Sequence, residues 1–253
     1  MAAAGEIETP DCAIFADTQS EPGSVYRWLD YLIPLLPFPV HIVSAGSLRD
    51  EILAAAAAGN MSCGRPPFFI RNPDGSKGIV RRQCTRDFKI DVILRKQREL
   101  IGLQPRQRGP REPMIESWIG ISLDEKQRMS ESMHAYIRKR FPLIERRMNR
   151  WDCLEWIRRA GHPRPPKSAC FFCPFRRDAE WREMRDNEPA DFIAACDLDR
   201  ALRAGVIAGL DGEPFVHDSL VPLSEVDLST PADYGQLDLL HPMQMECAGV
   251  CGV

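Results

Sequence analysis

Two cysteines separated by two residues form the clearest chemical motif of this chain. In the segment 168–175, Phe171 and Phe172 lie between Cys170 and Cys173, and Phe175 follows them. A C-x-x-C pair of this kind is typical of metal ligands, of iron–sulfur cluster ligands and of redox disulfides. Two thiols do not complete a four-ligand site. Further cysteines must therefore join this pair if it holds a metal or a cluster.

The cysteine content of the whole chain favours metal binding or catalysis over structural disulfides. The chain has nine cysteines in 253 residues. Its first residues lack the charged-then-apolar pattern of a signal peptide, and no apolar run reaches the ~20 residues that cross a bilayer. We therefore expect a cytoplasmic protein without a membrane contact, in which thiols stay reduced. Zinc in a closed tetrahedral site and an iron–sulfur cluster are the two alternatives.

Basic residues are concentrated in the middle of the chain. Residues 81–111 contain ten Lys/Arg against three Asp/Glu, whereas residues 197–253 contain two against ten. This distribution suggests an anionic partner, either a phosphorylated nucleotide or a nucleic acid, although an exposed basic face is the alternative. The candidates to bind a phosphate or sulfate group are Arg81, Arg82, Arg86, Lys89 and Arg128.

The first sixty residues alternate between apolar runs and amphipathic segments. The pattern predicts a strand at 12–16, a helix from Pro22, a strand at 39–43 and a helix at 51–58. This order is typical of a parallel α/β sheet, in which ligands bind at the carboxyl ends of the strands. Asp17 and Thr18 follow the first strand, so they are candidates to contact a ribose or a phosphate. An Asx-type turn or a helix cap is the alternative for both residues.

The rest of the chain gives further elements and a division into two portions. We expect strands at 66–70 and 78–80 around an Asn72–Gly75 turn, a helix ending at Gly102, a strand at 117–121 and helices at 150–160 and 189–204. In the helix 150–160, Trp151 is expected to face inward. The predicted organisation is an α/β domain over residues 1–135 and a Cys-rich helical and irregular portion over residues 136–253.

Several short motifs, taken in order, resemble the phosphoadenosine phosphosulfate (PAPS) reductase family, especially its bacterial and phage members. They are Cys12–Thr18 for the second strand and its "DTG" turn, Cys84–Lys89 for the "C…K" helix start, Gly120–Arg128 for the "G-x-R…E…R" segment, Cys170 and Cys173 for the C-x-x-C of the iron–sulfur branch, and Glu246–Cys247 for the "E-C-G" motif. The resemblance implies a Rossmann-like parallel sheet of the adenine nucleotide alpha hydrolase-like type.

The resemblance also implies a reaction and its residues. The reaction is thiol-dependent reduction of an adenylated sulfate, with an adenine sulfonucleotide or ATP as ligand and a thiol reductant protein as partner. Cys247 is then the catalytic cysteine, Glu125 joins Lys89 and Arg128 in the nucleotide site, and Cys251 could resolve the intermediate. The implied [4Fe–4S] ligands are Cys84, Cys170, Cys173 and, as the fourth, Cys153.

The sequence departs from that family at three places, which leaves other functions open. The Gly-rich S-G-G-x-D-S loop is absent, so we expect an N-terminally truncated domain. Cys84 stands where the iron–sulfur branch has two adjacent cysteines, and the distance from Cys173 to Cys247 is longer than the family pattern. The alternatives are a sulfurtransferase that thiolates or phosphorothioates nucleic acid and a non-catalytic, metal-stabilised binding module.

Overall fold

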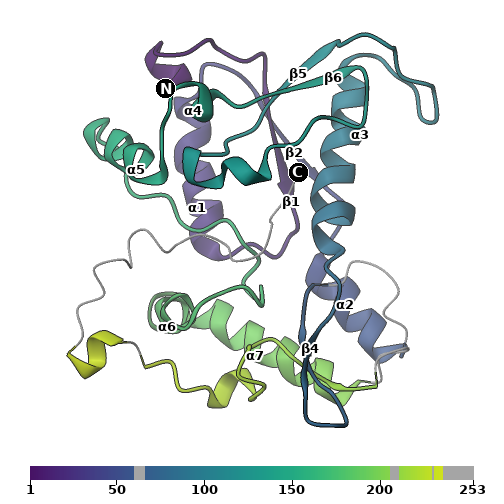
Figure 1. Ribbon diagram of the computed structural model, residues 1–253, viewed down its shortest axis with the longest axis vertical. Helices are drawn as coiled ribbons and strands as arrows, with labels where there is room; N and C mark the ends of the chain where they lie inside the picture. Colours follow the sequence, from purple (N-terminus) through teal and green to yellow (C-terminus); the bar gives the residue numbers. More distant parts are fainter. Residues whose placement is uncertain (60–65, 206–210, 230, 236–253) are drawn as a thin grey trace. The chain divides into compact units, whose positions relative to one another are not determined.

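The structure is a computed structural model, and it describes residues 1–59, 66–205, 211–229 and 231–235 (Figure 1). The α-helices are α1 (Gly23–Leu32), α2 (Leu48–Ala57), α3 (Asp91–Leu100), α4 (Pro142–Glu145), α5 (Arg150–Arg159), α6 (Asp178–Asn187) and α7 (Pro189–Ala204). The strands are β1 (Ala13–Asp17), β2 (Val40–Ser44), β3 (Phe69–Arg71), β4 (Lys77–Ile79), β5 (Ile115–Trp118), β6 (Ile137–Arg140) and β7 (Glu213–Phe215). The shorter turns are η1 (Ala2–Ala4), η2 (Ile33–Leu35), the π-helical η3 (Arg86–Ile90), η4 (Leu123–Arg128), η5 (Leu223–Glu225) and η6 (Pro231–Tyr234).

The described chain groups into two units by its internal contacts. The first unit contains residues 1–93 together with 166–239, and the second contains residues 94–165. The division falls within α3, and the boundary expected after residue 135 lies inside the second unit. In the described part of the chain, no helix is both long and apolar enough to cross a bilayer.

The predicted strand–helix–strand–helix order of the first sixty residues is confirmed. Strand β1 pairs with β2 in parallel, from Ala13 opposite Val40 to Asp17 opposite Ser44. Helix α1 connects the two strands, as a parallel pair requires. The Ser47 hydroxyl caps α2 by accepting from the Asp50 N–H at 3.2 Å, and the helix begins at Leu48, three residues before the predicted start.

The other strands form small sheets rather than one extended parallel sheet. In the first unit, β3 pairs antiparallel with β4 and with β7. In the second unit, β5 pairs with β6 in parallel. The described chain is therefore a mixed α/β protein with two-stranded parallel sheets, and a Rossmann-like fold is not confirmed. The hairpin predicted around Asn72–Gly75 is present, with Gly75 at φ +81° in its turn.

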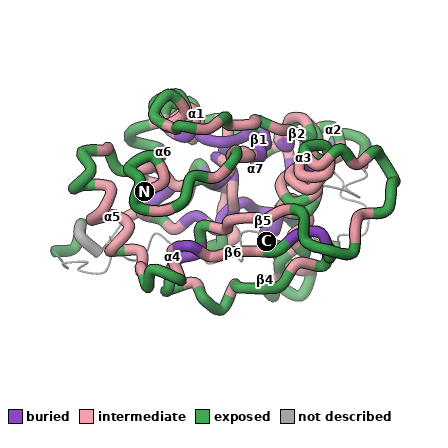
Figure 2. Tube along the Cα trace, turned by 90° about the horizontal axis from the view of Figure 1, so that it is seen from above, coloured by how far each residue is buried: buried purple, intermediate pink, exposed green. Residues whose placement is uncertain are grey.

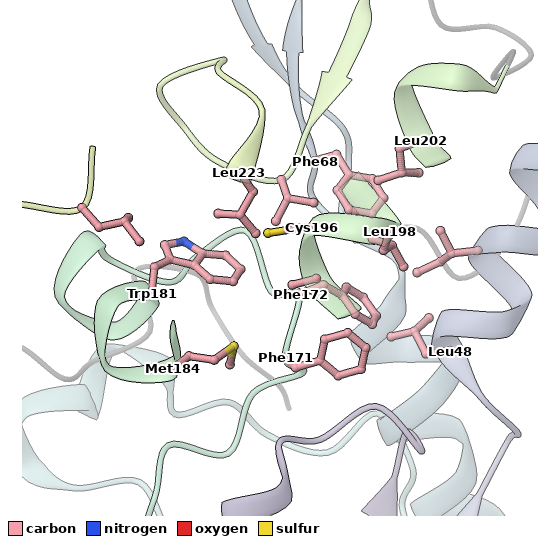
Figure 3. Close-up of a cluster of buried hydrophobic side chains, with 14 of the residues drawn as sticks. Leu48, Phe68, Phe171, Phe172, Trp181, Met184, Cys196, Leu198, Leu202 and Leu223 are labelled. Carbon is pink, nitrogen blue, oxygen red and sulfur yellow. The ribbon is translucent and has the colours of Figure 1, made fainter. Parts of the chain in front are cut away.

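The hydrophobic core of the first unit joins the C-x-x-C segment to the helices. Helix α7 lies against α2, α6 and β7. Phe171 and Phe172 project into one cluster with Leu48 of α2 and Leu198 of α7 (Figure 3). The two phenylalanine rings meet edge-to-face, with centroids 4.9 Å apart. Burial of these aromatic side chains therefore fixes the backbone between Cys170 and Cys173.

Three sequence predictions differ from the structure. Trp151 was expected to face inward, but its side chain is 56 % exposed and α5 has no buried residue (Figure 2). The strand expected at 117–121 ends at Trp118 in β5. Helix α6 was not expected, although Trp181 and Met184 place it in the core. Its charged residues hide the apolar spacing, because only one side of the helix is buried.

Candidate functional site

The turn that follows β1 places polar side chains in the interior of the first unit. Thr18, Ser20 and Glu21 are only 1 %, 1 % and 4 % exposed. The Thr18 carbonyl accepts from the Leu48 N–H at 3.0 Å, and the Ser20 hydroxyl accepts from the Arg49 N–H at 3.1 Å. The first N–H groups of α2 therefore donate hydrogen bonds to this turn and hold it at the carboxyl end of the parallel strand pair.

The C-x-x-C segment is bound directly to this turn. The Thr18 Oγ1 and the Cys170 Sγ lie 3.4 Å apart. The Phe171 N–H donates to the Ser20 carbonyl at 2.9 Å, and the Cys173 N–H donates to the Cys170 carbonyl at 2.9 Å. The two cysteines thus lie in a tight turn against the end of β1, although about 150 residues separate them from it.

The buried carboxylate of Glu21 and the ammonium of Lys89 lie beside the same turn. The Lys89 ammonium of η3 lies 3.3 Å from the Glu21 Oε1, and the Thr18 hydroxyl donates to the same oxygen at 3.3 Å. Among the described residues, the buried Glu21 Oε2 has no hydrogen-bond partner. Lys89 keeps 32 % of its side chain exposed, so its charge is held by Glu21 and still reaches solvent. We call Thr18, Glu21, Cys84, Lys89 and Cys170 the β1 site.

The thiols of the β1 site are in their protonated form at neutral pH. Burial raises the pKa of Cys170 to about 12, and the Glu21 carboxylate adds to this effect while Lys89 opposes it. Burial also raises the pKa of Cys84, against the opposing charges of Arg82 and Lys89. A protonated thiol is a poor nucleophile. These two cysteines are therefore poor nucleophiles as they stand, and their binding of a metal stays a prediction.

The structure brings four of the predicted site residues together and gives the others different surroundings. Cys84, Lys89, Cys170 and Thr18 belong to the β1 site, and Cys173 is in the same tight turn as Cys170. Cys84 and Cys170 both pack against the hydrophobic core cluster of the first unit. The structure thus brings the cysteine pair to the end of β1, a contact that the sequence did not predict.

Asp17 has the geometry of an Asx turn. Its Oδ1 accepts from the Gln19 N–H at 2.7 Å and from the Tyr26 hydroxyl at 2.9 Å. Burial, together with this hydrogen bond to Asp17, raises the pKa of Tyr26. Gln19, which stands where the family motif has glycine, adopts φ +53°. Asp17 therefore shapes the turn that carries Thr18, and its contact with a ligand stays a prediction.

The basic candidates of the first unit lie on and beside η3. Arg81 and Arg86 are exposed, and the Arg86 Nε lies 4.0 Å from a carboxylate oxygen of Asp91. The Arg82 guanidinium lies over the Phe175 ring at 6.0 Å, which places it next to the C-x-x-C segment. Of these three arginines, Arg82 is the one that the contacts bring to the cysteines.

The remaining predicted residues lie elsewhere in the chain. Glu125 and Arg128 belong to the second unit, where they form an ion pair with each other. Cys153 also belongs to the second unit, and burial followed by the charge of Asp152 raises its pKa. Cys247 lies outside the described residues, as do Glu246 and Cys251.

The described part of the chain contains one close group of possible metal ligands, and it lies outside the cysteines. Among the described residues, the only three His, Cys, Asp or Glu side chains with ligand atoms all within 4.8 Å are Asp178, His217 and Asp218. Thiolates around one zinc ion would be roughly 3.8 Å apart, from a Zn–S bond of about 2.3 Å. Each cysteine of a [4Fe–4S] cluster binds a different iron, so its ligands are farther apart. Among the described residues, Cys84, Cys170 and Cys173 do not form such a close group, so zinc and an iron–sulfur cluster both stay predictions for them.

Hydrogen bonds and an ion pair explain why Asp178, His217 and Asp218 lie close together. The His217 Nδ1 accepts from the Ser219 N–H at 3.2 Å, so its Nε2–H donates to the Asp178 Oδ1 at 3.0 Å. The Lys77 ammonium lies 3.3 Å from the Asp218 Oδ2, where it disfavours a second cation. The buried histidine thus ties the start of α6 to the loop after β7.

Glu21 is the site residue that sequence reasoning missed. The sequence places it three residues after Thr18 and directly before Pro22, in a segment that was interpreted as the start of a helix. An acidic residue in the turn after an apolar strand is a weak signal, because its partner Lys89 is 68 positions away. Comparisons of this chain with protein family models, with curated proteins and with solved structures gave no match.

Proposed function

We propose that the protein carries out PAPS-reductase-like sulfur chemistry, the thiol-dependent reduction of an adenylated sulfate beside an iron–sulfur cluster. One observation carries the proposal. The Thr18 hydroxyl meets the Cys170 thiol at 3.4 Å, and Lys89 and Cys84 adjoin the same point. Three segments that resemble separate motifs of one enzyme family therefore converge on one place in the first unit.

The chain's own residues have distinct tasks in this proposal. Cys84, Cys170 and Cys173 would hold the cluster, and Phe171 and Phe172 would shield it with an apolar wall. A bound cluster would supply iron in place of the thiol protons and one-electron redox capacity. Lys89, oriented by Glu21, would bind the anionic sulfate group of the substrate.

The reaction needs a nucleophilic thiol other than Cys170, whose proton is held too tightly. The Cys247 thiolate would attack the sulfur of the sulfonucleotide, break its bond to the phosphate oxygen and release the adenine nucleotide. This leaves a thiosulfonate on Cys247. Attack by the Cys251 thiol would then release sulfite and form a Cys247–Cys251 disulfide. A thiol reductant protein would return both cysteines to the reduced state, so that two electrons and two protons balance the cycle.

Sulfite release tests this proposal. Protein purified without oxygen should release sulfite from adenylyl sulfate or from its 3′-phosphorylated form when a thiol reductant is present. Cys247→Ser should abolish the release, and Lys89→Gln should raise KM more than it lowers kcat, because Lys89 binds the substrate in this account. Cys12→Ser provides a matched thiol control. Full activity of the Cys247→Ser variant would contradict the mechanism.

A nucleic-acid sulfurtransferase is the second candidate, and the charge of the second unit favours it. Residues 94–165 carry 17 Lys/Arg and 9 Asp/Glu, a net charge of +8. This enzyme would transfer sulfur to a nucleic acid rather than release sulfite. Incorporation of radioactive sulfur into RNA or DNA, without sulfite production, would distinguish it from the reductase.

A further inference from the structure

The second unit has a charge distribution that the sulfur chemistry of the first unit does not explain. Residues 94–165 have a net charge of +8, whereas the remaining 181 residues carry 16 Lys/Arg and 27 Asp/Glu, a net charge of −11. Ten arginines of this unit are exposed: Arg95, Arg106, Arg108, Arg111, Arg138, Arg146, Arg147, Arg158, Arg159 and Arg164. A small anion would engage only a few of them, but a polymer of phosphates can engage many.

An open recess beside β6 lies in the same unit. Its volume is about 440 Å³. Three consecutive cationic residues, Arg138, Lys139 and Arg140, line it together with the apolar side chains of Met129, Phe141 and Ile144. Two carboxylates, Glu116 and Glu145, complete the lining. We call this hollow the β6 recess. Its combination of positive charge and apolar surface matches the two parts of a nucleotide, the phosphate and the base.

The cations of the β6 recess are not equally neutralised. Arg138 pairs with Glu116, and Arg140 lies 3.2 Å from Glu116 and 3.0 Å from Glu145. Lys139 differs, because its ammonium donates to the Ser130 hydroxyl at 3.1 Å and, within the described ranges, no carboxylate lies within 4.0 Å of it. It is also partly desolvated. The Glu131 carboxylate acts on this ammonium, but less strongly than burial, which lowers the pKa of Lys139. A partly desolvated ammonium without a close ion pair is a binding point for an incoming anion.

From these features we infer that the β6 recess binds single-stranded nucleic acid, with a phosphate at Lys139 and an unpaired base against Met129 and Phe141. A base inside a duplex cannot reach an apolar wall, so the recess selects single strands. The exposed arginines of the second unit then bind the neighbouring phosphates. The inference does not rest on the proposed sulfur chemistry, because binding is measured without turnover.

Fluorescence anisotropy of the full chain with labelled strands of about 20 nucleotides tests this inference, given site sizes of roughly 4–16 nucleotides in such proteins. RNA and DNA strands of mixed sequence are compared. Lys139→Gln should weaken binding about five- to tenfold and reduce the slope of log K against log salt by about 0.7, the value for one lost phosphate contact. Met129→Ala should weaken binding about threefold without changing that slope, since it removes a contact with the base.

Arg200→Gln is the charge-matched control, because Arg200 is exposed on α7 in the first unit and pairs with Asp197. It should leave binding unchanged, and Lys139→Gln should keep the wild-type unfolding midpoint. Three results would overturn the inference. They are absence of binding at 50 mM salt, equal losses in the Lys139 and Arg200 variants, and tighter binding of duplex or of free adenine nucleotide than of the single strand.

Discussion

The two units differ in how deeply their polar side chains are buried. The first unit buries Thr18, Glu21 and Asp199, which are 1 %, 4 % and 1 % exposed, and supplies each of them with hydrogen bonds. In the second unit, ten of the fourteen arginines are exposed, and helix α5 has no buried residue (Figure 2). Buried polar groups are costly unless they are paired, so they define one conformation. Exposed charges cost little and remain available to a partner.

Under the two proposals, this difference assigns one activity to each unit. A site that must hold thiols in fixed positions requires a dry, well-packed surrounding, which the core around Phe172 and Trp181 provides (Figure 3). A surface that binds a flexible anionic polymer requires accessible cations, which the second unit provides. The following predictions test the contrast, beginning with the largest expected effect.

Asp199 should be the most sensitive carboxylate of the first unit. Its two oxygens accept from the Val216 N–H at 2.8 Å and from the Leu223 N–H at 2.9 Å, and it also pairs with Arg203. Asp199→Ala should lower the free energy of unfolding by about 3–5 kcal/mol, because it leaves a cation and two buried N–H groups without their partner. Urea unfolding followed by circular dichroism measures the loss.

The matched control is Glu155→Ala in the second unit. Glu155 pairs with Arg158 and Arg159 on the surface of α5. Its removal should not shift the unfolding midpoint measurably, since exposed ion pairs are screened by solvent. Similar losses in both variants would show that the two units do not differ as described.

Truncation of a tryptophan should also cost more stability in the first unit than in the second. Trp181 is 0 % exposed in the core of the first unit, and Trp151 is 56 % exposed in the second. Trp181→Ala should cost about 3 kcal/mol of stability, at the lower end for such truncations because its buried Nε1 has no partner among the described residues. Trp151→Ala should change stability by less than about 0.5 kcal/mol. Thermal unfolding of both variants checks the pair, and a large loss for Trp151→Ala would contradict its exposure.

Glu116 should give a small effect that depends on pH. Hydrogen bonds from Arg138 and then from Trp118 lower its pKa from 4.5 to about 2. Because the folded pKa lies below the unfolded one, its stabilising effect is complete above about pH 5 and disappears as the pH falls towards 2. Glu116→Gln should therefore lower stability by under about 1 kcal/mol at pH 7, given solvent screening, and by nothing near pH 2. A pH-independent difference in urea midpoint would argue against the ion pair as its cause.

The sequence predicted the parts of the fold that depend on local patterns. The strands β1 and β2 follow from apolar runs, which act over a few residues. Strand β7 was not predicted, because its three residues are stabilised by pairing with β3, more than 140 positions away. Trp151 was placed inward because a large apolar residue usually faces a core, and tertiary packing overrides that tendency here.

The candidate site was predictable only as a set of residue types. The spacing of Cys170 and Cys173 indicated ligands, and the end of β1 indicated a ligand-binding edge. Neither pattern could show that Thr18 contacts Cys170 or that Glu21 lies buried against Lys89, because these contacts join segments that only the fold brings together. The high pKa of Cys170 likewise follows from burial, which no local pattern records.

Iron and acid-labile sulfide in protein purified without oxygen test the central claim most directly. The account predicts both in the wild-type protein, with a visible iron–sulfur absorbance band that is lost in Cys170→Ser and Cys84→Ser and retained in Cys12→Ser. The band should be lost in both variants because Cys84 and Cys170 both belong to the β1 site. Wild-type protein that contains zinc and no iron, or a band that survives Cys170→Ser, would contradict the claim.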